Sequence, residues 1–189
     1  MTTKRLKESP SQTAGPYVHI GCTPNFAGIT GVYASDPGAT MLTDSTEGER
    51  ITVTGTVYDG EDAPLTDALI EIWQADAAGH FSTTNTGFTG WGRCPADQDT
   101  GAWRFETIRP GATGGGAAHI TFWIVARGIN VGLHTRMYFP DEPKLPSDPW
   151  LSLVEDTRRD TLITKQVADG HFQFNIHLQG PNETVFFDA

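Results

Sequence analysis

The sequence predicts a mostly β protein, folded as a sandwich of two sheets. From residue 50 onward, apolar and polar side chains alternate over short stretches, which is the pattern of half-buried strands. Gly, Pro, Asp and Asn close these stretches and favour turns between them. With 189 residues, of which 38% are hydrophobic and 19% charged, the chain is long enough for one domain with its own core. Roughly seven short strands of this kind are typical of a sandwich.

The expected strands follow one another with few interruptions. The first, at 51–57, places threonines opposite its apolar residues, and the sequence YDG at 58–60 then turns the chain. The clearest, at 171–178, has an apolar side chain at every second position, so that these side chains share one face. The predicted strands are residues 51–57, 68–74, 103–108, 119–126, 134–139, 171–178 and 184–187.

Two regions depart from this strand pattern. Between residues 149 and 165 the apolar residues form an imperfect helical stripe, which predicts one short helix region. In residues 1–49, Pro and Gly interrupt every candidate element, so we expect an extended N-terminal arm. The arm includes Tyr17, Phe26 and Tyr33 and is too apolar for a freely solvated tail, although a loose terminus is the usual case. We therefore predict that residues 1–49 pack on a partner chain and that residues 50–189 form the sandwich core.

Composition and charge narrow the possible functions. The formal net charge of −10 at pH 7 gives no electrostatic basis for binding nucleic acid. No run of about 18 apolar residues occurs, and the N-terminus has no apolar core of signal-peptide length, so we expect no membrane span and no export. Cys22 and Cys94 give no disulfide framework and no C-x-x-C motif, which favours reduced thiols in the cytoplasm.

General catalytic motifs are absent: there is no Gly-rich phosphate loop, no G-x-S-x-G elbow and no H-E-x-x-H zinc helix. Longer strings occur instead, in this order: PSQTAGPY (10–17), VYDG (57–60), EIWQAD (71–76), GWGRC (90–94), IRPG (108–111), AHIT (118–121) and ETVFF (183–187). Together these strings resemble the intradiol ring-cleaving dioxygenase family over nearly the whole chain. The resemblance implies a β-sandwich, a ferric centre and cleavage of an aromatic diol by O2 between its hydroxyl-bearing carbons.

The iron ligands of the family are largely missing from this chain. Family enzymes hold Fe(III) with two tyrosinates and two histidines of an H-x-H pair, and residues i and i+2 of a strand face the same side. Here the matching string is His119-Ile120-Thr121, and no tyrosine lies between Trp73 and His119. The opening string is most similar to the α chains of two-chain family members. The resemblance therefore implies that His119 and Thr121 are vestigial, that this chain binds no metal, and that a partner β chain binds the Fe(III).

The resemblance also places the arm of such α chains at the substrate pocket of the β chain. The matching residues here are Thr13, Gly15, Pro16 and Tyr17. Gly and Pro fix a tight backbone shape that can approach an aromatic ring, and Tyr17 offers a flat apolar face and a hydroxyl. In the alternative reading, the Gly-Pro pair is only a turn and Tyr17 only anchors an interface.

Arg136 is the candidate cation for an anionic substrate. Strand alternation places His134, Arg136 and Tyr138 on one face. By resemblance this arginine belongs near the pocket, where its guanidinium matches the geometry of a substrate carboxylate. The alternative is a surface arginine paired with one of the 23 acidic residues.

The expected function is that of an α subunit, inactive alone, that completes the substrate pocket of an iron-bearing β chain in an intradiol dioxygenase. Two alternatives belong to other classes: a stand-alone catechol-type intradiol dioxygenase, and a non-catalytic β-sandwich that binds carbohydrate or protein. The missing tyrosines and histidine argue against the first alternative. The ordered family strings argue against the second.

Overall fold

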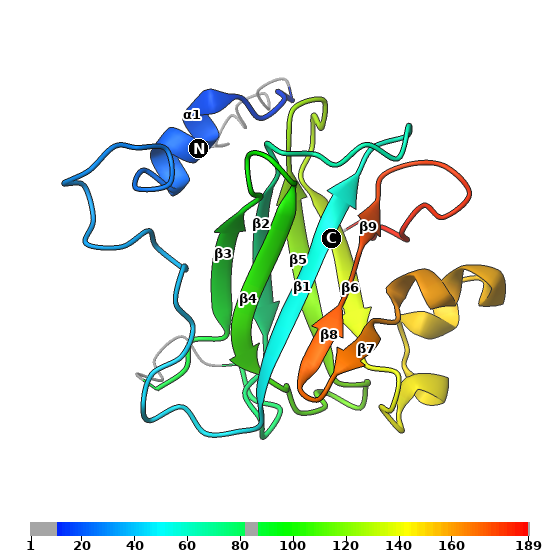
Figure 1. Cartoon of the computed structure of the whole chain (residues 1–189). Coiled ribbons are helices and arrows are strands. Elements are labelled where there is room, and N and C mark those ends of the chain that lie inside the picture. The colour runs from blue at the N-terminus through cyan, green and yellow to red at the C-terminus, as the bar shows by residue number, and fades with distance from the viewer. Residues whose placement is uncertain (1–10, 82–86, 189) are drawn as a thin grey trace, which may run out of the picture.

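The computed structural model describes residues 11–81 and 87–188, and these residues form a β-sandwich (Figure 1). One described sheet has the order β4-β1-β8-β7, with β9 also paired to β1, and the other has the order β3-β2-β5-β6. The strands are β1 (Arg50–Tyr58), β2 (Leu69–Gln74), β3 (Trp91–Pro95), β4 (Ala102–Ile108), β5 (His119–Val125), β6 (Leu133–Tyr138), β7 (Lys165–Ala168), β8 (His171–Gln173) and β9 (Ile176–His177). The predicted fold class is confirmed.

Strand β1 is the centre of the first sheet, antiparallel to β4 and parallel to β8 and β9. The prediction of one unbroken strand at 171–178 is wrong, because the pairing stops between β8 and β9. At this break the side-chain oxygen of Asn175 accepts a hydrogen bond from the backbone N–H of Thr56 at 3.3 Å. The Phe174 carbonyl oxygen lies 2.0 Å from where a Cβ on Gly55 would stand, so the close approach of the two backbones requires glycine at position 55.

The second sheet contains a strand that the sequence pattern does not reveal. In strand β3, Gly92 interrupts the alternation of apolar and polar side chains. A Cβ at position 92 would lie 2.5 Å from the sulfur of Met41, so the Met41 side chain occupies the space that a side chain there would need. The prediction of a strand at 184–187 is wrong: this segment makes one isolated bridge, from Phe187 to His134. Between its backbone bonds, Val185 accepts a hydrogen bond from the Thr135 hydroxyl at 2.7 Å and donates its N–H to the Thr161 hydroxyl at 3.3 Å.

The core lies between the two sheets and follows the predicted alternation. On β5, Ile120, Phe122 and Ile124 are buried, and the residues between them are partly exposed on the other face. The rings of Trp103 on β4 and of Phe174, which lies between β8 and β9, are each 5.4 Å from the ring of Phe122. This packing leaves the outer face of β5 and β6 available to a further layer.

That outer face is covered by short 3-10 helices, here called the 3-10 layer: η1 (Leu145–Ser147), η2 (Leu151–Leu153) and η3 (Asp156–Leu162). The predicted helix at 149–165 is therefore present only as separate 3-10 turns, and from residue 165 the chain is strand β7. The guanidinium of Arg159 donates to the carbonyls of Leu151 and Val154 at 2.9 and 3.0 Å. In a continuous α-helix, these carbonyls would instead accept from backbone N–H groups. Tyr138, Leu151, Val154 and Leu162 form a second apolar cluster beneath the layer.

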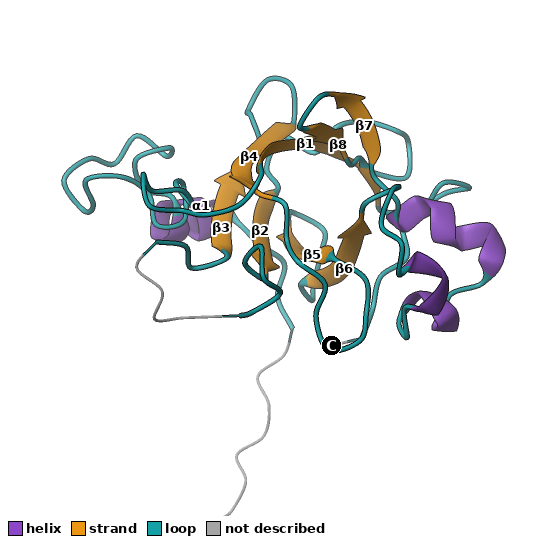
Figure 2. Ribbon diagram, turned by 90° about the horizontal axis from the view of Figure 1, so that it is seen from below, coloured by secondary structure: helices purple, strands orange, loops and turns teal. Residues whose placement is uncertain are grey.

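The arm lies on the side of the sandwich opposite the 3-10 layer (Figure 2). The sequence predicts an extended arm, but the arm contains the helix α1 (Pro16–Cys22). Pro16 occupies the first helical position, where its missing N–H would have no partner in any case. None of the residues of α1 is buried. Among the described residues, no helix is long and apolar enough to cross a membrane.

Candidate functional site

The outer face of β5 and β6 brings four of the singled-out residues together. His119 and Tyr138 are directly opposite each other in the two strands, and Thr121 is opposite Arg136. The alternate residues Thr135 and Met137 point into the core, so Arg136 and Tyr138 share the outer face, as the sequence predicts.

Asp148 organises this face from the 3-10 layer. Its side chain is 1% exposed and accepts four hydrogen bonds. The donors are the hydroxyl of Tyr138 at 3.1 Å and the backbone N–H groups of Ala117, Trp150 and Leu151 at 2.8, 2.9 and 2.9 Å. Burial opposes ionisation of the carboxyl, but these donors outweigh it and lower the pKa of Asp148 below 3.8. The carboxylate thus connects β6, the loop before β5 and the 3-10 layer.

The two titratable neighbours of Asp148 are held neutral. Burial is the main cause that raises the pKa of Tyr138 well above 10, with Arg136 opposing the shift. Burial also lowers the pKa of His119 below 6.5, and the charge of Arg136 lowers it further. Nδ1 of His119 lies 2.8 Å from the carbonyl oxygen of Ala117, so that a donated hydrogen bond there fixes the ring.

Arg136 has no carboxylate partner within the described part of the chain. Its Cζ lies 4.2 Å from the ring centroid of Trp150 and 6.0 Å from that of Phe187. Both oxygens of the nearby Asp148 are already engaged with other donors. The alternative reading of Arg136, as one half of a surface ion pair, therefore has no support in the described contacts.

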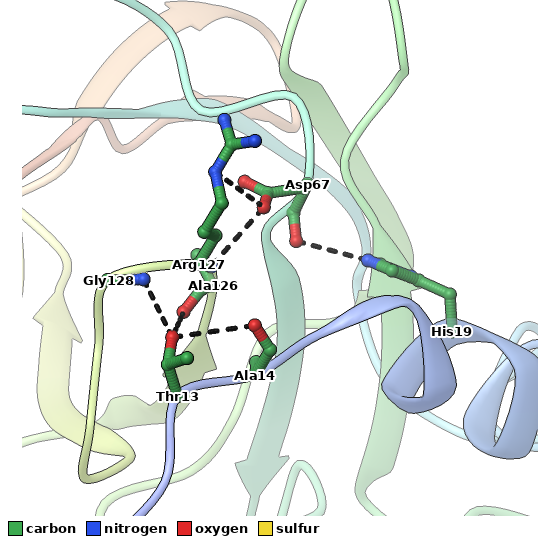
Figure 3. Close-up of polar contacts among 7 residues, drawn as sticks. All are labelled: Thr13, Ala14, His19, Asp67, Ala126, Arg127 and Gly128. Atoms are coloured by element: carbon green, nitrogen blue, oxygen red, sulfur yellow. Dashed lines mark hydrogen bonds and ion pairs between the residues drawn. The ribbon is translucent and has the colours of Figure 1, made fainter.

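The arm is attached at the far end of β5 (Figure 3). The backbone N–H of Gly128 donates to the hydroxyl of Thr13 at 2.7 Å, and that hydroxyl lies 3.5 Å from the Ala126 carbonyl. His19 Nε2 lies 3.0 Å from the Asp67 carbonyl oxygen. These few polar contacts link the start of the arm to the sheet.

The remaining arm residues of interest face outward. A Cβ on Gly15 would meet nothing within 4 Å, and Tyr17 is 84% exposed. Thr13, Gly15 and Pro16 line a groove of about 650 Å³ together with residues of α1 and with Asp67, Gln98 and Arg127.

The predicted site residues thus fall into two groups that the chain does not bring together. Thr13 contacts the backbone at residues 126 and 128, beyond the end of β5, whereas Arg136 is opposite Thr121 near its beginning. Five residues of a strand span roughly 16 Å. A partner site that uses both the arm and Arg136 has to extend along β5 between them.

Comparison with known proteins places this arrangement in a family. The family described as Dioxygenase matches residues 23–180, and the protocatechuate 3,4-dioxygenase α chain of Pseudomonas putida is 40% identical over the full length of both chains. This chain belongs to the intradiol dioxygenase family.

Other family members are more distant. The protocatechuate 3,4-dioxygenase β chain of Burkholderia cepacia is 37% identical over 72% of this chain and 67% of its own length. Among solved structures, the dioxygenase domain of a dioxygenase carbohydrate-binding fusion protein from Streptomyces sp. SirexAA-E superposes with a TM-score of 0.60 at 27% identity, covering 95% of this chain and all of that domain.

Intradiol dioxygenases are iron-dependent, but the donor groups on this outer face do not fit a ferric ion. Tyr138 is kept protonated and donates to Asp148, so it does not offer a tyrosinate, and His119 is a single histidine where the family has an H-x-H pair. Thr121 offers only a neutral hydroxyl. The described residues contain no cluster of three or more His, Cys, Asp or Glu side chains that could hold a metal.

Asp148, Trp150 and Phe187 belong to this site, although sequence reasoning missed them. Phe187 is the last residue of the string ETVFF, which indicates the family but no role for this side chain in the site. Asp148 precedes Pro149, and an aspartate before proline favours a turn in which its side chain caps the following N–H groups. This dipeptide is the local sequence signal for Asp148, and it does not indicate which distant groups the carboxylate binds.

Proposed function

We propose that this chain is the α subunit of a protocatechuate 3,4-dioxygenase, in which it completes the substrate pocket of an iron-bearing β chain. The assembly would add both atoms of O2 to protocatechuate and open the ring between its hydroxyl-bearing carbons, giving 3-carboxy-cis,cis-muconate. The observation that carries this proposal is the 40% identity with an α chain over the whole length of both proteins. The unsuitable donor set on the outer face of β5 and β6 supports the same assignment.

The iron belongs to the β chain in this proposal. Bound there, Fe(III) supplies the charge that stabilises the deprotonated diol and orients it toward O2. This chain also resembles a β chain, at 37% identity, so the two subunits share a fold on which one has the ligands and the other does not. The work left to this chain is to shape the pocket, exclude water and provide positive charge.

The arm would shape the pocket. Residues 1–49 pack on the β chain in this proposal, and residues 50–189 form the core. Thr13 fixes the start of the described arm, while Gly15 and Pro16 present a backbone surface without bulky side chains. Tyr17, at 84% exposure, offers an uncovered ring and hydroxyl that a partner surface would bury.

Arg136 would bind the carboxylate of protocatechuate. It lacks an acidic partner in the described chain, so its charge is available to an anionic ligand. The subunit would work in the cytoplasm, where its two free thiols, Cys22 and Cys94, remain reduced.

The direct test is to produce this chain with a candidate β chain, and separately alone. Iron per chain and protocatechuate-dependent O2 uptake are then measured in each preparation. We expect iron and turnover only in the pair, with about one iron for each α/β pair. Stoichiometric iron and turnover in the lone chain would instead indicate a stand-alone dioxygenase.

The arm is tested in the same complex. Tyr17→Ala should raise the KM for protocatechuate or weaken association with the β chain, because the exposed ring would lose its contact surface. Leu153→Ala is a matched control, since Leu153 is 78% exposed in the 3-10 layer, away from the arm. Equal behaviour of the two variants would remove the arm from the pocket.

A further inference from the structure

Three residues around the Arg136 guanidinium, Trp150, Phe187 and Asp148, are here called the holder. We infer that Trp150 and Phe187 are positioning residues that fix Arg136 for the substrate carboxylate, and that Asp148 fixes Trp150 in turn. This inference rests on the proposed role of Arg136 in binding that carboxylate. It adds Asp148, Trp150 and Phe187 to the residues that the sequence alone places at the pocket.

Trp150 contacts one face of the guanidinium, so this contact does not use the N–H donors, one of which points toward the Tyr138 hydroxyl and opposes the rise in its pKa. The Cζ of Arg136 lies 4.2 Å from the Trp150 ring centroid, which is the distance of a cation–π contact. The N–H donors of a guanidinium lie in its plane, where they match the two oxygens of a carboxylate. An aromatic partner therefore orients the arginine without occupying those donors, whereas a carboxylate partner would occupy them and offset the positive charge.

Both rings are fixed to the frame that carries Arg136. The backbone N–H of Trp150 donates to Asp148, which also receives the hydroxyl of Tyr138 on β6. The backbone N–H of Phe187 donates to the His134 carbonyl on the same strand at 2.8 Å. The two rings meet edge to face, with centroids 5.7 Å apart. The holder is thus a rigid extension of strand β6.

Asp148 also explains why Arg136 has no acidic partner among the described residues. It is the buried carboxylate of this cluster, and its two oxygens accept four other donors. The chain carries a formal net charge of −10, so a flexible arginine would readily find an acidic neighbour. The aromatic contact and the engaged Asp148 together keep a free positive charge in an acidic protein.

The expected consequence is selectivity for a carboxylated diol over the same diol without the carboxylate. We would measure KM and kcat of the α/β complex for protocatechuate and for catechol. Trp150→Leu should raise the KM for protocatechuate by about fivefold, since it removes a cation–π contact, with kcat and the catechol KM within twofold. Trp150→Phe restores a ring and should recover most of the protocatechuate KM. Leu153→Ala is the control and should change neither substrate.

Arg136→Leu separates this inference from the proposal beneath it. It should raise the protocatechuate KM by roughly 10- to 100-fold, and adding Trp150→Leu to it should have no further effect. An unchanged KM in Arg136→Leu would end the carboxylate role of Arg136, and the holder with it. A selective loss in Arg136→Leu but not in Trp150→Leu would overturn the holder alone. Equal losses with both diols, or no rescue by phenylalanine, would reduce Trp150 to a packing residue.

Discussion

The arm and the 3-10 layer cover opposite sides of the same sandwich, and they are held in different ways. The helix of the arm buries none of its residues, and its start is joined to the sheet by a few polar contacts of Thr13 and His19. The 3-10 layer buries Leu151 and Leu162 and places Asp148 under four hydrogen bonds. The start of the arm and α1 depend little on the core of this chain, although Met41 near the end of the arm lies in that core. The 3-10 layer instead has its own apolar cluster with Tyr138.

This difference indicates what each region needs from its surroundings. An apolar segment with little burial of its own gains order from a second surface, so the exposed Tyr17, Val32 and Tyr33 of the arm call for a partner. The 3-10 layer needs none, because a buried carboxylate connects it to β6 and to the loop before β5. In effect, Asp148 crosslinks this chain at a face whose donors do not suit a metal.

The largest expected effect is the loss of this crosslink. Asp148→Ala leaves four donors without their acceptor, one of them in the buried Tyr138, and should cost about 3 kcal/mol. Urea unfolding of the α/β complex would measure the change. Asp156→Ala is the control, because the carboxylate of Asp156 is 86% exposed and its ion pair with Arg159 lies on the surface. Similar losses in the two variants would contradict a special role for Asp148.

The pH dependence of this stabilisation has a definite sign. The folded pKa of Asp148 is below its ordinary value of 3.8, so its contribution is present above pH 3.8 and is lost as pH falls through the folded pKa. The difference in unfolding free energy between the wild type and Asp148→Ala should therefore shrink below pH 3.8. A constant difference from pH 6 to pH 3 would show that the carboxylate charge is not what stabilises this face.

The next effect tests the weaker attachment of the arm. Thr13→Val keeps the shape of the side chain but removes the acceptor for the Gly128 N–H, which should loosen the arm by about 1 kcal/mol. Limited proteolysis between residues 11 and 49 would detect the loosening in the unpaired chain. Unfolding of the core should stay unchanged. A matching loss of core stability would mean that the arm is as integral as the 3-10 layer.

Alternation alone predicted the sandwich, because burial on one face of a strand leaves a period of two in the sequence. It gave six of the strand positions closely or in part, and it placed Arg136 and Tyr138 on one face. It could not predict β3, where Gly92 makes room for Met41, or the break at Asn175, where a side chain replaces a backbone partner. Asp148 was missed for the same reason: its partners are far away in sequence, and only the fold brings them together.

A smaller effect concerns His119. Its folded pKa is lowered, first by burial, so the unfolded chain binds more protons and stability falls as pH drops below about 6.5. His119→Gln should remove this dependence and cost about 1 kcal/mol at pH 7, because the contact of Nδ1 with the Ala117 carbonyl is lost. Iron per α/β pair should not change. A drop in bound iron would make His119 a ligand and contradict its vestigial role.

The smallest effect lies where the arm meets the loops that flank β2 and β5. Asp67 forms a 3.8 Å ion pair with Arg127, whose side chain is 84% exposed, so Asp67→Asn should change stability by less than about 0.5 kcal/mol. The backbone carbonyl of Asp67, which faces His19, is unaffected by this substitution. His19→Ala removes that contact and should expose the arm to protease more than Asp67→Asn does. If the ion pair mattered more, surface charge rather than the His19 contact would hold α1 in place.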